Sequence, residues 1–436
     1  MNSVQLFWFT HLLKAGFFKH PGALALWQAL HQSLATPSAA SSTPPAQTSL
    51  FTPFFAYESG TTIPPSYPTS YALQGITGGN SSGDYIISGT KNLANGGNPA
   101  AQGLVYQGPI NAANTLQGNG SGTWTIMNVP NGINTINNPT VNSYTNTSIY
   151  GVDNLGNGLV NLVGSVSPAN VTYDSAGFPA NTLGFYYAGP ITTTPNKNDF
   201  QVFQPKFSDG SLANYTFIHS INGGLAAGGY DSFPTRPGIH AFIYNPTASD
   251  SNKQKDIIIP GSDNALTKTA YGIWHNQGSS YTIAGGVGLQ YDASRKKTIG
   301  NQSEGLGSAY LLDYDSVTGL FSNYKTFNYP STSASKTLET HFEGIWYNGN
   351  GTYKLPATIS PGPNGSLGAA ATATITRDNL TGGFSNASWE ILPLNYPSTG
   401  AVPVFTTNDS IFDKASVGAY TLSQNIFSDY AFLNAT

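Results

Sequence analysis

The chain lacks cysteine and has few charged residues of either sign. Its 436 residues include no cysteine, and Asp, Glu, Lys and Arg together make up 9%. The absence of cysteine excludes disulfides, thiolate catalysis and cysteine-ligated metal sites. The formal net charge is only −4 and the densest basic cluster is residues 295–297. Nothing in this charge distribution predicts binding to nucleic acid or to an anionic membrane.

Long apolar runs and the usual catalytic motifs are missing as well. No stretch approaches the roughly 18 uninterrupted apolar residues of a membrane-spanning helix, so we expect no transmembrane span. The sequence contains no nucleophile elbow around serine, no His-Glu-x-x-His motif and no phosphate-binding glycine loop. It therefore predicts no bound metal and no cofactor, and no known motif assigns a catalytic residue.

Glycine, proline and aromatic residues are abundant instead, and part of the chain repeats. The 49 glycines, 28 prolines, 25 tyrosines and 23 phenylalanines are typical of many short strands joined by turns. Residues 315–323 (DSVTGLFSN) return as residues 378–386 (DNLTGGFSN). A repeat at such a distance indicates one supersecondary unit that is copied along or around an array.

Six copies of this unit can be traced from their first strands. Each copy begins with a small residue followed by Ile or Val, and short runs of alternating apolar character come after it. The six starts are Gly75-Ile76, Gly151-Val152, Ser220-Ile221, Gly272-Ile273, Gly344-Ile345 and Ser410-Ile411. The last copy ends after its third strand, and we expect the apolar residues 49–56 to supply the missing one. The pattern predicts an all-β fold: a six-bladed β-propeller over residues 49–436, closed by its N-terminal strand, with five blades as the alternative.

The first 48 residues differ in kind from the repeats. Residues 4–34 fit one or two short helices, and a linker rich in Ala, Ser, Pro and Thr follows them. One interpretation of residues 1–48 is an export signal, because basic residues precede an apolar stretch and small residues come after it. The other is an amphipathic helical segment that docks on the propeller or on a partner, including another copy of the chain.

The third copy resembles a known kind of repeat. Residues 219–230 (HSINGGLAAGGY), followed by residues 240–245 (HAFIYN), are similar to the bacterial extracellular HAF repeats, named for that His-Ala-Phe. Residues 418–420 (GAY) with residues 430–434 (YAFLN) are a looser copy, and the resemblance extends over residues 72–436. It implies an exported, propeller-like array. The family has no assigned reaction, so the resemblance implies no catalytic residue.

The residue before each repeat start is a candidate for the centre of the molecule, because the first strand of each propeller blade lines the central channel. These predicted channel residues are Gln74, Tyr150, His219, Tyr271, Glu343 and Asp409. Glu343 and Asp409 come from neighbouring copies, and two carboxylates in one cavity can serve as acid and base in glycoside cleavage. The alternative is a polar lining around water, which buried polar groups require in any case. We favour the polar lining.

Aromatic residues near the first strands are the second set of candidates. They are Trp274, His275, Trp346, Tyr347 and His341. Rings in loops at one face of a propeller can stack on sugar rings or on peptide side chains, which predicts a ligand-binding surface. The alternative role for these rings is packing between blades.

Together these features favour an exported or surface-associated β-propeller, extracellular or at the cell surface, that binds a neutral glycan or a protein. We lean against an enzyme and expect no hydrolytic activity. One alternative is a glycan-active hydrolase or lyase that uses the channel carboxylates. The other is a structural subunit of an extracellular layer or filament. Fold alone does not decide among them.

Overall fold

The computed structural model describes most of the chain after residue 50. The described residues are 51–54, 70–92, 101–110, 122–170, 181–232, 236–261, 265–292, 297–299, 307–330, 339–360, 362, 366, 368–378, 380–392, 405–423 and 426–433. The predictions for residues 1–48 lie outside them. Strands dominate this part, whose helices are the short 3-10 turns η2 (Lys197–Asp199) and η3 (Asp250–Asn252). The predicted all-β class is confirmed.

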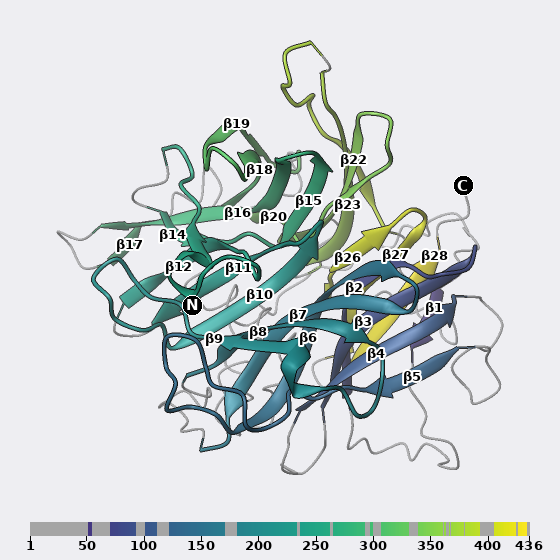
Figure 1. The fold of residues 1–436 in the computed structure, drawn as a ribbon. Helices are drawn as coiled ribbons and strands as arrows, with labels where there is room; N and C mark the ends of the chain where they lie inside the picture. The colour runs from purple at the N-terminus through teal and green to yellow at the C-terminus, as the bar shows by residue number, and fades with distance from the viewer. Residues whose placement is uncertain are drawn as a thin grey trace.

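Antiparallel strands follow one another along the chain in six units, which we number in sequence order (Figure 1). Unit 1 contains β2 (Ser70–Gly78), β3 (Asp84–Asn92), β4 (Ala101–Pro109) and β5 (Thr123–Ile126). Unit 2 contains β6 (Tyr144–Gly156), β7 (Leu159–Pro168), β8 (Leu183–Pro190) and β9 (Phe200–Phe203). Unit 3 contains β10 (Tyr215–Asn222), β11 (Leu225–Ser232), β12 (Arg236–Tyr244) and β13 (Gln254–Asp256).

The remaining units have the same order but divided strands. Unit 4 contains β14 (Ala265–Lys268), β15 (Gly272–Gln277), β16 (Ser280–Asp292), β17 (Lys297–Ile299), β18 (Gly307–Asp315) and β19 (Phe321–Phe327). Unit 5 contains β20 (Glu339–Phe342), β21 (Trp346–Tyr347), β22 (Thr352–Ser360), β23 (Ala369–Thr376) and β24 (Ser388–Ile391). Unit 6 contains β25 (Phe405–Thr406), β26 (Ser410–Phe412), β27 (Ala415–Ser423) and β28 (Ile426–Leu433). Single parallel residue pairs, Ile239 with Thr267 and Gly307 with Glu339, join units 3, 4 and 5 into one continuous sheet.

The two ends of the described chain meet in unit 6. The strand β1 (Phe51–Phe54) pairs antiparallel with β28, and Phe51 lies opposite Phe432. Figure 1 shows the two strands side by side. This is the partner expected for residues 49–56. Unit 6 also contacts unit 1, since a Cβ on Gly78 would lie 2.8 Å from the ring of Phe412.

The glycines that start the repeats are required where first strands pass one another. A Cβ on Gly75 would lie 2.5 Å from the backbone oxygen of Tyr150 in the next unit. A Cβ on Gly151 would lie 2.8 Å from the backbone oxygen of His219. Side-chain carbons do not approach backbone this closely, so a glycine is needed for the inner strands to pack at this spacing. This explains the Gly-Ile signature of the sequence.

The apolar core lies between neighbouring units. One buried cluster joins Ile86 and Val105 of unit 1 to Leu162 and Phe185 of unit 2. Similar clusters join units 2 and 3, units 3 and 4, units 4 and 5, and units 6 and 1. Each sheet therefore buries apolar side chains on both faces, and the packing runs from unit to unit around a common centre.

The repeated sequence motif forms a surface turn. After β18, the Asp315 carboxylate accepts hydrogen bonds from the backbone N–H groups of Val317 and Thr318. After β23, the Asp378 carboxylate accepts the equivalent bonds from Leu380 and Thr381. An aspartate that bonds its own backbone two and three residues on stabilises a tight turn. The repeated sequence thus encodes the same surface turn in both copies.

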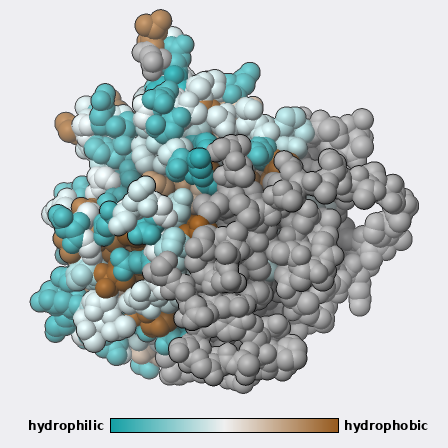
Figure 2. All heavy atoms as spheres, turned by 90° about the vertical axis from the view of Figure 1, so that its right-hand side faces the viewer, coloured by the Kyte–Doolittle hydropathy of each residue, from teal (hydrophilic) through white to brown (hydrophobic). Residues whose placement is uncertain are grey.

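The described surface carries only scattered apolar side chains. The exposed large ones include Ile258, Val317 and Leu380. The face in Figure 2 shows hydrophobic side chains in small separate spots among hydrophilic ones. No helix among the described residues is long and apolar enough to cross a membrane.

Candidate functional site

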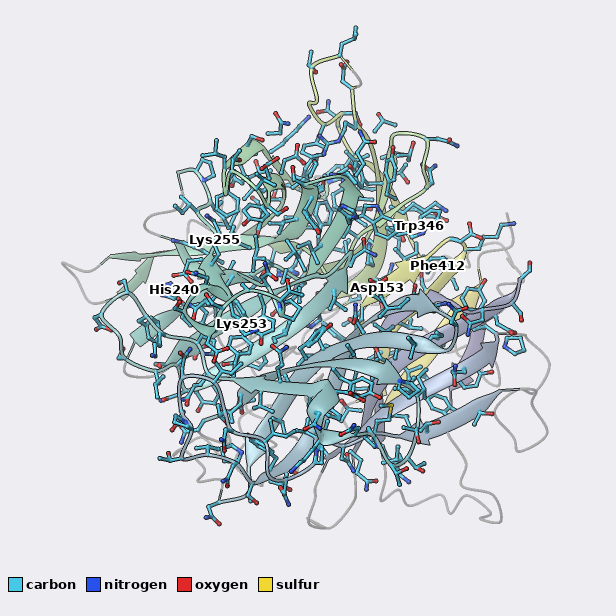
Figure 3. All side chains as sticks on the ribbon, in the orientation of Figure 1. Asp153, His240, Lys253, Lys255, Trp346 and Phe412 are labelled. Atoms are coloured by element: carbon cyan, nitrogen blue, oxygen red, sulfur yellow. The ribbon has the colours of Figure 1, made fainter. Side chains whose placement is uncertain are left out.

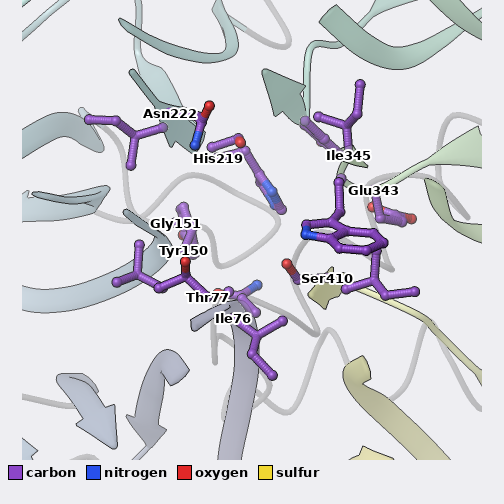
Figure 4. A pocket seen from close by; sticks show the side chains of 18 of the residues that line it. Ile76, Thr77, Tyr150, Gly151, His219, Asn222, Glu343, Ile345 and Ser410 are labelled. Carbon is purple, nitrogen blue, oxygen red and sulfur yellow. The ribbon is translucent and has the colours of Figure 1, made fainter. Parts of the chain in front are cut away.

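A pocket lies at the centre, where the first strands of all six units meet (Figure 4). All the predicted channel residues line it: Gln74, Tyr150, His219, Tyr271, Glu343 and Asp409. Each is at most 5% exposed. The pocket has a volume of about 480 Å³ with its open mouth included, and about 50 Å³ of this can hold the centres of water molecules. The inner part is therefore narrow.

Stacked rings form one wall of this pocket. His219 lies between Tyr150 and Tyr271, with ring centroids 5.3 Å and 4.1 Å away and both pairs stacked. The hydroxyl of Tyr150 is 2.6 Å from Ser165 Oγ, which fixes the outer end of the stack. The Tyr271 ring continues to His341, whose centroid is 4.7 Å away. These contacts hold the rings in place without a ligand.

Carboxylates form the opposite part of the wall. The backbone N–H of Glu343 donates to Pro356 O at 2.8 Å, and that of Asp409 donates to Val417 O at 2.8 Å. These bonds attach each acidic residue to the second strand of its own unit. The two carboxylates therefore approach the pocket from neighbouring units on fixed backbone. Figure 4 shows Glu343 and His219 entering from different sides.

His341 lies behind Glu343 and outside the pocket lining. Its Nδ1 is 3.6 Å from Glu343 Oε1, and its Nε2 is 2.6 Å from Thr269 Oγ1. The ring therefore connects the acidic wall of the pocket to the first strand of unit 4. A protonated His341 would stabilise the ionised form of Glu343, because an opposite charge at this distance favours the charged form.

Glu339, at the start of the strand β20 that leads to Glu343, is a further acidic residue that the sequence analysis missed. Residues 339, 341 and 343 are two apart, so their side chains share one face of an extended segment. Burial, and secondly the charge of Glu343, raise the pKa of Glu339 to about 7. The spacing was visible in the sequence, but the burial was not.

Gln74 has an environment unlike that of the other channel residues. Its side chain is 2% exposed, and neither its amide nitrogen nor its amide oxygen has a hydrogen-bond partner in the part of the chain that the structure describes. Gln204, also 2% exposed, is fully engaged: it donates to Ala213 O at 2.6 Å and accepts from Asn138 at 2.8 Å. Buried amides normally have partners, so Gln74 is an exception.

The predicted aromatic set divides into two groups. Trp274 and Trp346 line the pocket and are half-buried. Trp346 lies beside Phe412, with centroids 6.0 Å apart (Figure 3), so it also contributes to packing between units 5 and 6. His275 and Tyr347 are not among the lining residues. Their polar atoms serve local turns, with His275 Nε2 2.8 Å from Gly278 O and the Tyr347 hydroxyl accepting from Gly351 N at 2.9 Å.

A further carboxylate lies next to the lining residue Asn222. Asp153 (Figure 3) accepts hydrogen bonds from Gly223 N at 3.2 Å and from the Asn222 amide at 3.4 Å. Burial raises its pKa to about 6 despite these bonds. The lining residues themselves include no lysine and no arginine. The lining is thus acidic and aromatic, while Lys354 lies over the lining residue Trp346, with its Nζ 5.6 Å from the ring centroid.

No family model matches the chain, and no curated protein matches it. The resemblance to HAF repeats therefore stays a prediction. Similar solved structures include the GH43 endo-arabinanase from Bacillus licheniformis, with 11% identity and a TM-score of 0.35 over 65% of this chain and 91% of that one. They also include an α-L-arabinanase of Cellvibrio cellulosa with arabinohexaose, with 12% identity and a TM-score of 0.33 over 74% and 96% of the two chains. A sialidase from Streptococcus pneumoniae has 8% identity and a TM-score of 0.47 over 88% and 71%.

These findings correct the expectation of a non-catalytic binding protein. Several of the similar structures are glycan-cleaving enzymes by name, among them the arabinanases and an α-L-arabinofuranosidase from Lactobacillus brevis, and another is a protein of unknown function. The names of these enzymes agree with the alternative that the sequence left open, a glycan-active hydrolase. At these identities the similarity transfers no residue and no activity to this chain.

Proposed function

We propose that the protein is a glycoside hydrolase whose active site is the central pocket, with Glu343 and Asp409 as its carboxylate pair. The observation that carries the proposal is that these two buried carboxylates, from neighbouring units, line one pocket whose opposite wall is aromatic. Glycosidases use two carboxyl groups on either side of the scissile bond. Aromatic faces suit the apolar faces of sugar rings.

The fold that we propose for this enzyme is a six-bladed β-propeller in which each unit is one blade. Support comes from the buried clusters that connect units 1 to 5 in sequence order and from the cluster that connects unit 6 to unit 1. Units 5 and 6 are linked by Asn408, whose amide donates to Ala371 O at 2.9 Å. The proposed setting is outside the cell, where polymeric glycans are accessible.

The two carboxyl groups take different roles in this proposal. Glu343 is the base in this proposal, with His341 Nδ1 at 3.6 Å from its carboxylate. Asp409 is the acid: it gives its proton to the glycosidic oxygen as the C–O bond breaks and the electron pair moves to that oxygen. Water adds to the anomeric carbon and gives its proton to Glu343. Acid–base assistance of this kind contributes about 10² to 10⁴ in rate.

The test is release of reducing sugar from a panel of plant and bacterial polysaccharides that includes arabinan. We expect turnover by the wild type and losses on the order of 10² to 10⁴ in Glu343→Gln and in Asp409→Asn, with melting temperatures kept. Glu390→Gln is the matched control, since Glu390 is exposed on the outer strand β24 and should retain full activity. Sugar binding without turnover, or full activity in both pocket variants, would contradict the proposal.

A further inference from the structure

We propose that the substrate is a neutral glycan and that Gln74 binds two adjacent hydroxyl groups of the sugar held in the pocket. This inference rests on the proposed hydrolase function, but it concerns recognition and is tested by binding. Three observations support it: the acidic lining of the pocket, the hydrogen-bonding state of Gln74, and the size of the enclosed space.

The charges around the pocket disfavour an anionic sugar. Glu343 and Asp409 line the pocket, Asp153 bonds to the lining residue Asn222, and no lining residue is a lysine or an arginine. A uronate or sialate carboxylate in this pocket would lie beside the buried carboxylate of Glu343, which carries a charge of the same sign in the proposed mechanism. Like charges at short range in a poorly solvated site repel strongly. A neutral sugar has no such penalty.

Gln74 has the hydrogen-bonding groups that a pair of hydroxyls requires. Its amide oxygen accepts and its amide nitrogen donates, and neither is used within the described part of the chain. One sugar hydroxyl can donate to the oxygen while the adjacent hydroxyl accepts from the nitrogen. Burying an amide without partners is unfavourable, so a ligand that supplies both partners gains that free energy on binding.

The enclosed space limits how much of the sugar enters. About 50 Å³ is open to the centres of water molecules, which is room for the edge of one sugar residue. The remainder of the substrate would then lie across the mouth, where Trp274 and Trp346 line the pocket half-buried. Contact with one sugar edge fits recognition by a single amide.

The experiment compares Gln74→Leu with Gln204→Leu. The two glutamines are equally buried, but only the amide of Gln204 is hydrogen-bonded within the described part of the chain. Binding is measured by calorimetry with galactose and galacturonate oligomers, which differ in the carboxylate, and with arabino-oligosaccharides. We expect binding of neutral oligomers, at least tenfold weaker binding of galacturonate oligomers, and at least tenfold weaker binding of neutral oligomers by Gln74→Leu. The melting temperature of Gln74→Leu should equal or exceed that of the wild type. Gln204→Leu should melt lower and bind sugar normally while folded.

Several outcomes would overturn the inference. They are equal or tighter binding of galacturonate oligomers, unchanged sugar affinity in Gln74→Leu, or no binding of any of these sugars. A lower melting temperature in Gln74→Leu with normal sugar binding would show that Gln74 is satisfied by water or protein. Neutral-sugar binding that depends on Gln74 but leads to no cleavage would contradict the hydrolase and leave the recognition intact.

Discussion

The carboxylates of the repeated turns and those of the channel have opposite environments. Asp315, at a surface turn, accepts hydrogen bonds from the hydroxyls of Ser279 and Thr318. Such bonds stabilise the charged form and lower the pKa of Asp315 to about 2. Glu339 lies near the channel residue Glu343, and burial and the charge of Glu343 raise the pKa of Glu339 to about 7. One environment favours the carboxylate, and the other favours the neutral acid.

The repeated turns and the channel position also differ in how their sequence varies between units. The turn motif keeps its Asp and Thr-Gly in both copies, because the turn needs those groups at those positions. The channel position, in contrast, carries Gln, Tyr, His, Tyr, Glu and Asp in the six units. A position that is equivalent in structure but carries five residue types in six units is suited to binding an asymmetric ligand. We therefore expect the functional residues at the channel position, where the repeats differ in sequence.

The largest effect on stability is expected for the ion pair between Arg377 and Asp313, which connects the two turn regions. Arg377, beside Asp378, donates to both oxygens of Asp313 at 2.8 Å and 2.5 Å and also to Thr282. Arg377→Leu leaves Asp313 without this partner, and we expect a loss of about 3 kcal/mol in the free energy of unfolding, measured by urea denaturation. Activity per folded molecule should stay unchanged, because the pair is not part of the pocket lining.

The double variant Asp313→Leu/Arg377→Leu is the control for that change. Removing both partners leaves no uncompensated charge, so it should be more stable than Arg377→Leu alone. A single variant as stable as the wild type would show that the pair contributes nothing. A lower activity per folded molecule would show that the turn regions and the pocket are not independent.

A smaller effect, with a distinct pH dependence, is expected for Glu339. Its pKa is about 7 in the folded chain against an ordinary value of 4.5, so the folded state binds the proton more tightly. The contribution of Glu339 to the free energy of unfolding is therefore fully present below pH 4.5 and is lost as the pH rises through 7. Glu339→Gln keeps the neutral shape, so at pH 8 it should be more stable than the wild type by about 2 to 3 kcal/mol.

His341 and Glu343 are ionisable neighbours of Glu339, so the difference in stability between variant and wild type is the quantity to follow with pH. That difference should vanish near pH 4. In Glu343→Gln, which removes the second cause of the shift, the loss of stability should move to lower pH. Equal stability of Glu339→Gln and wild type at every pH would show that Glu339 is ionised and solvated.

Much of the framework was predictable because it follows from local spacing. The repeat starts identified six of the residues that line the pocket, since a period of two, and a glycine at four of the six starts, position the first strands. The second strand of unit 5 was hard to see in the sequence because Pro356 lies within β22, and proline is unusual inside strands. Its carbonyl nevertheless accepts the hydrogen bond of Glu343 N at 2.8 Å.

The chemical state of the site was not predictable in the same way. Burial of Glu339 and the missing partners of Gln74 depend on segments that are distant in sequence and come together only in the fold. The same holds for His341, which the sequence suggested as a stacking residue and which instead contacts Glu343 at 3.6 Å. The favoured function, a non-catalytic binding protein, was wrong by the names of the similar structures, several of which are glycan-cleaving enzymes.

The smallest effect is expected at the surface turn, where it should have the opposite sign of pH dependence from that of Glu339. The pKa of Asp315 is lowered from 3.8 to about 2, so its contribution to stability is present above pH 4 and is lost as the pH falls through 2. Asp315→Asn removes the charge and should lower the melting temperature slightly at pH 7, with a smaller difference from wild type near pH 2.

Asp378→Asn, in the second copy of the turn, should behave alike, because the pKa of Asp378 is also lowered by bonds from Thr381 and Leu380. Melting curves between pH 2 and 8 measure both variants beside Glu339→Gln. A turn variant whose deficit grows toward low pH would contradict the assigned bonds and remove the contrast between the two environments.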